Sequence, residues 1–250
     1  MIVLKTPEEI EKMKKANQIV AEILSRLSEL CQPGVSTWEL EEHTRLLVER
    51  YRVKPAFYQY RGYPCYLCAS VNEEVVHGIP DPKKILKEGD IISLDFGVVA
   101  DGFYGDAALT VKVGKVSKKV EKLVETTKEA LRRAVEQCRV GNRLSDIAQA
   151  VQGWVESQGF SVVRDFVGHG IGRNLHEDPQ VPNFGIPKPN YLLREGMVLA
   201  LEPMVNMGTW QVEVLDDGWT VVTLDRKPSA HFEHSVAITK KGPIVLSLVN

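Results

Sequence analysis

The chain has 250 residues, of which 44% are hydrophobic and 26% are charged, and its formal net charge is −2. This composition is typical of a globular protein with a sizeable core, and it contains no long block of Lys and Arg that would follow a nucleic-acid backbone. No apolar run approaches the roughly 18 residues of a membrane span and the N-terminus does not resemble a signal peptide, so we expect a cytoplasmic protein that binds neither membranes nor nucleic-acid sequences.

Two long helices are predicted at the start of the chain. Thr6 to Glu9 combines a capping hydroxyl, a proline in the first turn and a glutamate three residues after the cap, and apolar residues then recur every three or four positions to Leu30. Ser36 to Glu39 repeats the capping pattern and opens a second helix through Val48. The second half of the chain offers the same pair, from about Ser117 to Cys138 and from about Ser145 to Gln158.

Short runs rich in β-branched and aromatic residues predict strands between and after the helix pairs. These runs are Leu67 to Val71, Ile91 to Val99, Phe103 to Val113, Val162 to Val167, Met197 to Leu201, Thr220 to Leu224 and Ala230 to Thr239. Helix pairs followed by antiparallel strands, twice over, indicate an α/β fold in which helices cover a curved sheet.

Two apolar segments that each lead to an acid match one another at an offset of 107 residues: Leu86-Lys87-Glu88-Gly89 leads to Asp95, and Leu193-Arg194-Glu195-Gly196 leads to Glu202. The same offset relates Cys31 and Gly34 to Cys138 and Gly141. This pattern predicts an internal duplication, about 1–115 and 116–250, within a single domain that has a pseudo-twofold axis. An unpaired carboxylate in an apolar strand costs several kcal/mol, so each acid needs a partner or a metal.

A hairpin brings a second acid to Asp95. Asp101-Gly102 is a strong signal for a two-residue turn, and a turn centred there places Asp106 opposite Gly97, on the same face as Asp95. Two carboxylates on one face repel each other, and a divalent cation removes that repulsion. Within Ala230 to Thr239, strand alternation places His231, Glu233 and Ser235 on one face.

Histidines and cysteines supply further candidate ligands. His169 lies in Gly168 to Gly172, where alternating glycines permit close approach to the imidazole, and no helix follows that would make this stretch a phosphate loop. His176-Glu177 is not a helical zinc signature, because Pro179 interrupts it. Cys65 and Cys68 form a CxxC, for which zinc binding or redox chemistry stands beside the simpler reading of packed apolar side chains.

Taken together, these residues resemble the methionine aminopeptidases over nearly the whole chain. The motifs are Gly62-Tyr63-Pro64 to Cys68, Asn72-Glu73, Val76 to Pro80, Ser93-Leu94-Asp95, Gly105-Asp106, Gly168 to Gly172 with His176-Glu177 and Pro179, Leu201-Glu202-Pro203, and Glu233-His234. The short N-terminus without a zinc-binding extension and the 31-residue gap from Glu202 to Glu233 are similar to the bacterial type I enzymes. The resemblance implies the duplicated pita-bread fold, a curved antiparallel sheet covered by two helix pairs.

The resemblance also implies a dinuclear metal centre. Asp95 would chelate one ion, His169 and Glu202 the other, and Asp106 and Glu233 would bridge the two. Four carboxylates and an imidazole suit Co, Mn, Fe(II) or Zn, among which the ligands alone do not decide. The metal pair would activate a water, and the resulting hydroxide would attack the scissile carbonyl.

Roles for further residues follow from the same resemblance. Glu202 would shuttle the proton, His176 would donate to the developing oxyanion, and His77 would position the first peptide nitrogen. The methionine pocket would fall on Tyr60, Tyr63, Cys68 and Trp219, with Phe57 and Leu175 where relatives vary. Relatives often have Phe in place of Leu175 and Gln in place of His231. A monovalent-cation site would involve Asn72 and Ser229.

The expected activity is removal of the initiator methionine from nascent proteins whose second residue is small, by a monomer whose role is compatible with transient contact with the ribosome. Two alternatives stay open. A proline-specific aminopeptidase or prolidase has the same fold but usually carries an extra N-terminal domain. A non-catalytic pita-bread module that binds peptides or proteins typically lacks some of the ligands, whereas all five are present here.

Overall fold

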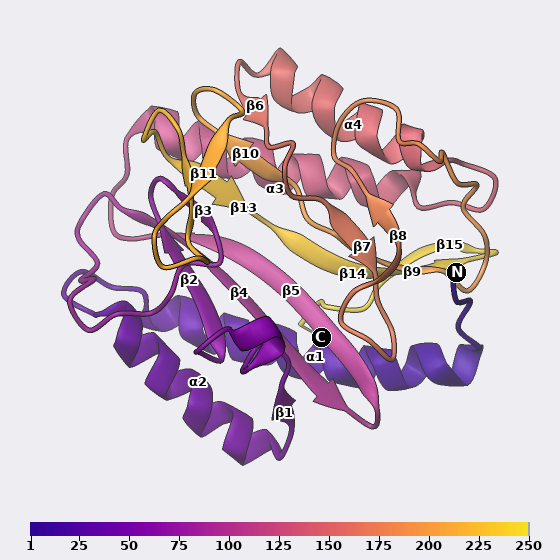
Figure 1. Cartoon of the computed structure of the whole chain (residues 1–250), viewed down its shortest axis with the longest axis horizontal. Coiled ribbons are helices and arrows are strands. Elements are labelled where there is room, and N and C mark those ends of the chain that lie inside the picture. The colour runs from indigo at the N-terminus through magenta and orange to yellow at the C-terminus, as the bar shows by residue number, and fades with distance from the viewer. Residues whose placement is uncertain (250) are drawn as a thin grey trace.

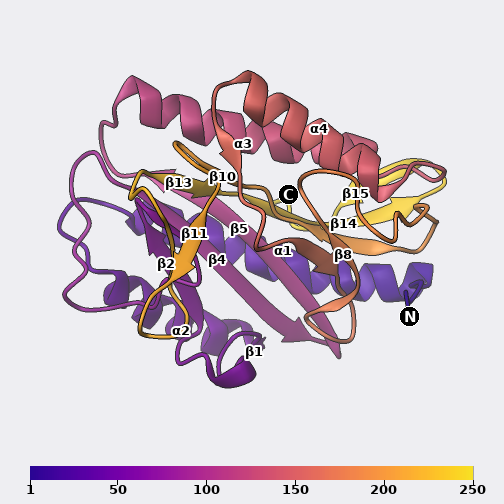
Figure 2. The same ribbon diagram turned by 45° about the horizontal axis from the view of Figure 1, so that its top comes forward.

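The computed structural model describes residues 1–249, which form two helix pairs along a strongly curved sheet (Figure 1). Turning the molecule shows α3 and α4 along one side of the strands and α1 and α2 along the other (Figure 2). The helices are α1 Pro7–Leu30, α2 Thr37–Tyr51, α3 Lys118–Gln137 and α4 Leu144–Ser157, with a short 3-10 helix η1 Tyr60–Gly62. None of the helices in this part of the chain is both long and apolar enough to cross a membrane.

The helix starts are those that the capping residues predict. The Glu9 N–H donates to Thr6 Oγ1 and the Thr6 N–H to Glu9 Oε2, at 3.3 and 3.0 Å, which is the reciprocal capping box. Ser36 and Glu39 make the same exchange at the start of α2. The Ser117 hydroxyl caps α3. Local sequence therefore fixes where these three helices begin.

The main sheet has nine strands, and every pairing within it is antiparallel. Its order is β1 Lys54–Pro55, β4 Ile91–Ala100, β5 Phe103–Lys112, β14 Glu233–Thr239, β9 Val198–Leu201, β7 Gly168–Gly170 and β8 Glu177–Val181, with β2 Leu67–Val71 beside β4 and β15 Gly242–Val245 beside β14. Two three-stranded sheets complete the fold: β13 Ser229–His231, β10 Met204–Asn206 and β6 Ser161–Val162; and β11 Val212–Val214, β12 Val221–Thr223 and β3 Glu74–Val76.

Two strand predictions are wrong in detail. The run from Val162 to Val167 is a strand only at its first residue, because the chain bends at Arg164 and Asp165. The run from Ala230 to Thr239 breaks at Phe232, so that β13 joins a small sheet while β14 joins the main one. His231 and Glu233 therefore belong to different sheets and do not share a strand face.

Side-chain alternation divides the sheet into an apolar face and a polar face. Leu94 and Phe96 of β4 pack in one core with α1, and Leu199 and Leu201 of β9 pack in another with α3 and α4. Residues between these apolar positions, beginning with Asp95, point to the opposite face. Each helix pair thus covers the apolar side of its own half of the curved sheet, and the acids lie together on the opposite side.

The two halves repeat the same backbone contacts at the offset of 107 residues. The Gly34 N–H donates to the carbonyl of Leu86 at 2.8 Å, and the Gly141 N–H donates to the carbonyl of Leu193 at 3.1 Å. The φ angles of these glycines are +97° and +96°, values that favour glycine. β5 of the first half pairs with β14 of the second, which joins the halves in one sheet. We propose from this that the chain is one domain built from a repeated unit.

Candidate metal centre

The β4–β5 hairpin sets two carboxylates side by side. Asp101 and Gly102 form its tight turn with φ angles of +50° and +76°. The register places Asp106 opposite Gly97, as predicted, and Asp95 opposite Ala108. Both acids therefore lie on the face that turns away from α1.

The second half of the chain brings the other three candidate ligands to the same face. Glu233, the first residue of β14, also lies opposite Ala108, so that Asp95 and Glu233 flank this small residue from two sides. Glu202 directly follows β9. His169 of β7 pairs with Ala200 of β9, two residues before Glu202. Neighbouring strands of one sheet thus carry all five candidates.

Distances between these side chains are those of a cluster that could bind a cation. The potential ligand atoms of Asp106, His169 and Glu233 all lie within 4.8 Å of one another. His169 Nε2 lies 3.4 Å from Glu202 Oε1 and 3.9 Å from Asp106 Oδ2. This is the one grouping of three or more His, Cys, Asp or Glu ligand atoms among residues 1–249.

Several carboxylate oxygens of the cluster lack any protein partner. Asp95 Oδ1, Asp106 Oδ1 and Glu233 Oε1 are buried and accept no hydrogen bond from the described part of the chain. A buried polar atom without a partner costs free energy, and such groups in a folded protein are explained by a bound ion or a functional role. Oxygen atoms of this kind, with one imidazole nitrogen, are a donor set that divalent transition metals accept, so the residues present fit metal ions.

The charge state of the acids leads to the same interpretation. Burial raises the pKa of Asp95 to about 7. Burial and the neighbouring carboxylates raise the pKa of Asp106, Glu202 and Glu233 well above their usual range. Four acids held so close cannot all ionise by themselves, whereas positive charge between them would displace their protons.

His169 is held with one ring nitrogen free for a metal. Its Nδ1 lies 2.9 Å from the carbonyl oxygen of Gly170, which can only accept, so Nδ1 carries the proton. Burial lowers the pKa of His169 to about 3, with the nearby His176 as a smaller cause. The imidazole is therefore neutral near pH 7, and its Nε2 lone pair faces Glu202 and Asp106.

The cluster lines a cavity of about 350 Å³ that also contains every predicted residue of the substrate site. Those residues are Phe57, Tyr60, Tyr63, Cys68, His77, Leu175, His176 and Trp219. Cys68 pairs with Asp95 across β2 and β4, and the ring of Tyr63 lies edge-on to Trp219 at 5.1 Å. The cavity thus has an acidic end and an aromatic side wall.

One hydrogen bond and several ring contacts place the two auxiliary histidines relative to these walls. Tyr60 Oη lies 2.8 Å from His176 Nδ1, and the His176 and His169 ring centres are 4.3 Å apart. His77 has a φ of +59°, which is rare for a residue with a side chain, and its ring lies edge-on to Phe166 at 5.6 Å. Burial lowers the pKa of His77 to about 4, so this ring is neutral as well.

Sequence reasoning missed several residues at this site. Arg61 reaches the cavity from η1, Gln180 from β8, and Asp165, Phe166 and Val167 from the irregular segment between β6 and β7, and no periodic pattern marks these residues as cavity residues. The ring of His231 is buried with neither nitrogen bonded within residues 1–249. Strand alternation and the difference from relatives single out His231 in the sequence, but neither indicates a role for it.

Two other predicted features stay outside the cluster. All four cysteines are free and buried, and burial raises the pKa of Cys65 to about 11, which favours packing over metal binding.

The Ser229 N–H donates to the Asn72 carbonyl at 2.8 Å, while the Asn72 amide bonds Asp90 and the Ile91 N–H. The monovalent-cation site at Asn72 and Ser229 stays a prediction.

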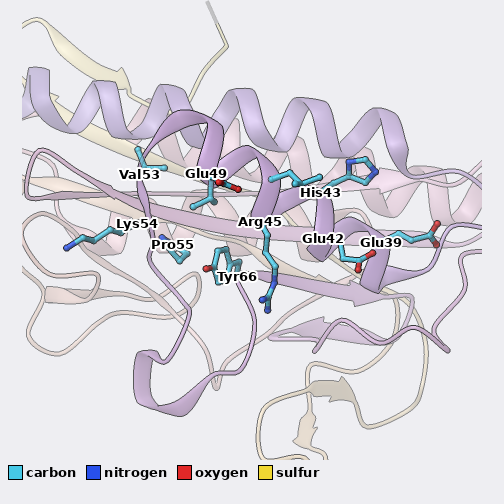
Figure 3. A pocket seen from close by; sticks show the side chains of 11 residues that line it. Glu39, Glu42, His43, Arg45, Glu49, Val53, Lys54, Pro55 and Tyr66 are labelled. Atoms are coloured by element: carbon cyan, nitrogen blue, oxygen red, sulfur yellow. The ribbon is translucent and has the colours of Figure 1, made fainter.

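A second hollow of about 890 Å³ lies on the exposed face of α2, far from the acids in sequence (Figure 3). Arg45 lies there with its guanidinium 4.7 Å from the ring centre of Tyr66, and its Nε is 2.8 Å from Glu41 Oε1. His43 is a solvated side chain at its rim. This hollow gathers no set of metal ligands, so the smaller cavity is the candidate functional site.

Known proteins with similar sequence and structure share this arrangement of the chain. A model of metallopeptidase family M24 matches residues 11–240. Methionine aminopeptidase from Clostridium perfringens (strain 13 / Type A) is 51% identical over 249 residues, which cover 100% of each chain. The crystal structure of methionine aminopeptidase from Thermotoga maritima has a TM-score of 0.97 at 50% identity and covers 99% of this chain and 100% of that chain.

A more distant likeness concerns a larger protein. The prolidase from Pyrococcus furiosus has a TM-score of 0.81 at 23% identity, over 99% of this chain and 66% of that chain. At this identity the likeness shows the fold alone.

Proposed function

The chain belongs to metallopeptidase family M24, and from this membership we propose that it is a methionine aminopeptidase, which removes the initiator methionine from nascent proteins with a small second residue. Its family and its full-length relatives identify the chain as a hydrolase that uses divalent metal. The fold is the pita-bread fold expected from the sequence. The observation that carries the proposal is the cavity in which four acids and His169 meet an aromatic pocket.

For the metal centre we propose two divalent ions, of Co, Mn, Fe(II) or Zn. Asp95 would hold one ion, His169 and Glu202 the other, and Asp106 and Glu233 would lie between them. When bound, the ions would supply Lewis-acid polarisation and an activated water. The unpartnered oxygens of Asp95, Asp106 and Glu233 support this assignment.

The remaining polar residues are proposed to act on the substrate. Glu202 lies at the acidic end of the cavity, with its Oε1 3.4 Å from His169 Nε2, where it would take up a proton and pass it to the leaving nitrogen. His176 would donate from Nε2 to the carbonyl oxygen that gains charge, because its Nδ1 is bonded to Tyr60. His77 would position the first peptide nitrogen.

The aromatic wall is proposed to recognise the methionine side chain. Tyr63, Cys68 and Trp219 are largely buried or packed against one another and form an apolar surface beside Asp95, with Tyr60 towards His176. A flexible thioether makes favourable contacts with aromatic rings. Phe57 and Leu175 would complete the pocket.

The alternatives from the sequence have less support. Prolidases are distant relatives that share the fold, and this chain spans about two thirds of the Pyrococcus furiosus protein. A module without activity is disfavoured because all five candidate ligands line one cavity. We further propose a monomer in the cytoplasm, acting on nascent N-termini in transient contact with the ribosome.

A peptide mixture tests the proposed function. The full chain, reloaded with Mn or Co, is incubated with Met-Ala-Ser, Leu-Ala-Ser, Met-Lys-Ser and Ala-Pro-Ser, and the products are scored by mass spectrometry. Loss of methionine from Met-Ala-Ser alone, abolished by chelator, is the expected result. Cleavage of Ala-Pro-Ser would indicate a proline peptidase, and no cleavage of any peptide with metal bound would favour a binding module.

A further inference from the structure

A buried ion pair outside the metal centre joins the first residues of the chain to Glu177, the first residue of β8. Lys5 Nζ lies 2.6 Å from Glu177 Oε2, and the two side chains are only 3% and 8% exposed. Lys5 Nζ also donates to the carbonyl of Val3 at 3.1 Å. Removing two charges from water is costly, and in some proteins such a buried pair fixes a specific geometry.

The carboxylate of Glu177 organises the loop that joins β7 to β8. Its Oε1 accepts hydrogen bonds from the N–H groups of Arg173 and Asn174, at 2.8 and 3.2 Å. The loop that these bonds close carries Leu175 and His176, which both line the metal cavity. Glu177 directly follows His176, the proposed oxyanion donor. Its carboxylate also binds the backbone before His176, so Glu177 holds the loop on both sides of that histidine.

The loop backbone is packed tightly onto the pair. A Cβ on Gly172 would lie 2.5 Å from Lys5 Cε and 2.7 Å from Glu177 Oε1, closer than atoms can approach. The Gly172 carbonyl accepts from the Tyr104 N–H of β5 at 2.8 Å, and Arg173 bonds Glu9 of α1 at 3.0 Å. Lys5 therefore lies at the centre of the contacts that fix this loop.

We propose that Lys5 is a positioning residue that, through Glu177, holds His176 in place over the metal cavity. The inference rests on the proposed role of His176 in the proposed function. Because Lys5 acts at a distance from the substrate, its loss should weaken the stabilisation of the transition state more than the binding of the peptide. A misplacement of about 1 Å can cost on the order of a hundredfold in rate.

The first test compares Lys5→Met with the wild-type protein, both metal-loaded, on Met-Ala-Ser. We expect kcat to fall about tenfold to a hundredfold with KM changed less than about twofold, and Lys5→Arg to restore most of kcat. Lys112→Met is the matched control, because it removes an exposed ion pair, Lys112 with Glu121 at 3.1 Å. An unchanged kcat in Lys5→Met would overturn the proposal.

The second test separates positioning from a general structural role. In a His176→Ala background, Lys5→Met should cause no further loss of kcat, whereas an equal loss in both backgrounds would show that Lys5 does not act through His176. If Lys5→Met unfolds or loses metal, Glu177→Gln is used in the same comparison, since it keeps an acceptor for the Arg173 and Asn174 N–H groups.

The third measurement does not depend on activity. The ring-proton NMR signals of His176, assigned by their loss in His176→Ala, should shift in Lys5→Met and remain in place in Lys112→Met. Unchanged His176 signals in Lys5→Met would overturn the proposal even if the protein cleaved no peptide. An inactive wild-type protein would overturn only the proposed function, so the two failures are distinguishable.

Discussion

The Nε2 atom of His169 lies 3.4 Å from the Oε1 atom of Glu202, although the two residues are 33 positions apart in the chain. Antiparallel pairing of β7 with β9 produces this contact, since His169 lies opposite Ala200. To bind one cation together, His169 would offer the Nε2 lone pair of its neutral ring, and Glu202 would first have to lose its proton. Metal binding and proton release are therefore coupled at this site.

Asp95→Asn isolates one part of this coupling in the metal-free protein. Burial raises the pKa of Asp95 from 3.8 to about 7 in the folded chain, so its stabilising effect is present below pH 4 and is lost as the pH rises through 7. The asparagine does not ionise. After chelation, Asp95→Asn should therefore exceed the wild type in free energy of unfolding above pH 7, by on the order of 4 kcal/mol, and match it near pH 4.

Urea unfolding at pH 4 and pH 8 measures this difference. Asp101→Asn is the control, because Asp101 is exposed at the tip of the same hairpin and has the same left-handed backbone that Asn tolerates. Added Mn should raise the stability of the wild type more than that of Asp95→Asn, which keeps the ligands proposed for the second ion. If the free energies of unfolding of the wild type and Asp95→Asn differed by the same amount at pH 4 and pH 8, ionisation of buried Asp95 would not be the cause.

Gly105 provides a prediction about how α1 supports the acids. A Cβ at this position would lie 2.7 Å from the backbone of Ala16 and Asn17, and the Asn17 side chain accepts from the Asp106 N–H at 3.2 Å. Gly105→Ala must therefore move α1 away from β5. We expect a loss of about 1 to 3 kcal/mol in free energy of unfolding, together with weaker metal binding.

Gly153 serves as the control, because its replacement by alanine should raise the free energy of unfolding instead of lowering it. Gly153 lies in the exposed part of α4, and a Cβ there would meet nothing within 4 Å. Gly153→Ala should stabilise the protein by about 0.5 to 1 kcal/mol, because it reduces the entropy of the unfolded chain. Thermal unfolding and metal titration of both variants test the pair. Equal shifts of both variants would refute a specific clash at Gly105.

Much of this site could be predicted because its elements are specified locally. The turn at Asp101 and Gly102 fixes the hairpin register, and register alone places Asp106 beside Asp95. The offset of 107 residues then indicated that Glu202 has a counterpart in Asp95. Strand alternation put His231 on the face of Glu233 and Ser235, which is wrong for His231 because alternation does not show which sheet a strand joins.

What could not be predicted depends on contacts between distant segments. The strand break at Phe232 does not interrupt the alternation of side chains in the sequence. It is seen only in the fold, where the Phe232 N–H donates to the carbonyl of Pro203 at 3.4 Å. Phe166 reaches the cavity from the irregular part of the predicted strand Val162 to Val167, and Gln180 reaches it from β8, which was not predicted. The Lys5–Glu177 pair joins residues 172 positions apart, and no periodic pattern signals such a contact.

Tyr60→Phe tests whether Tyr60 sets the tautomer of His176. The Tyr60 hydroxyl lies 2.8 Å from His176 Nδ1, and a donor there keeps the proton on Nε2, towards the substrate. We expect kcat on Met-Ala-Ser to fall about threefold to tenfold with KM little changed. Tyr58→Phe is the control, since Tyr58 is an exposed neighbour that stacks on Tyr66. A large rise of KM alone would assign Tyr60 to binding instead.

His77→Asn probes the proposed positioner of the peptide nitrogen without disturbing the backbone. The φ of His77 is +59°, a conformation that Asn adopts more readily than Ala, so the turn should persist. Loss of the imidazole should lower kcat/KM for Met-Ala-Ser about a hundredfold, because the ring can no longer hold the scissile bond in line. His43→Asn on α2 removes a solvated imidazole from the hollow in Figure 3 and should leave kcat/KM unchanged. Steady-state kinetics and metal content decide the matter: equal activity of both variants would remove His77 from the mechanism.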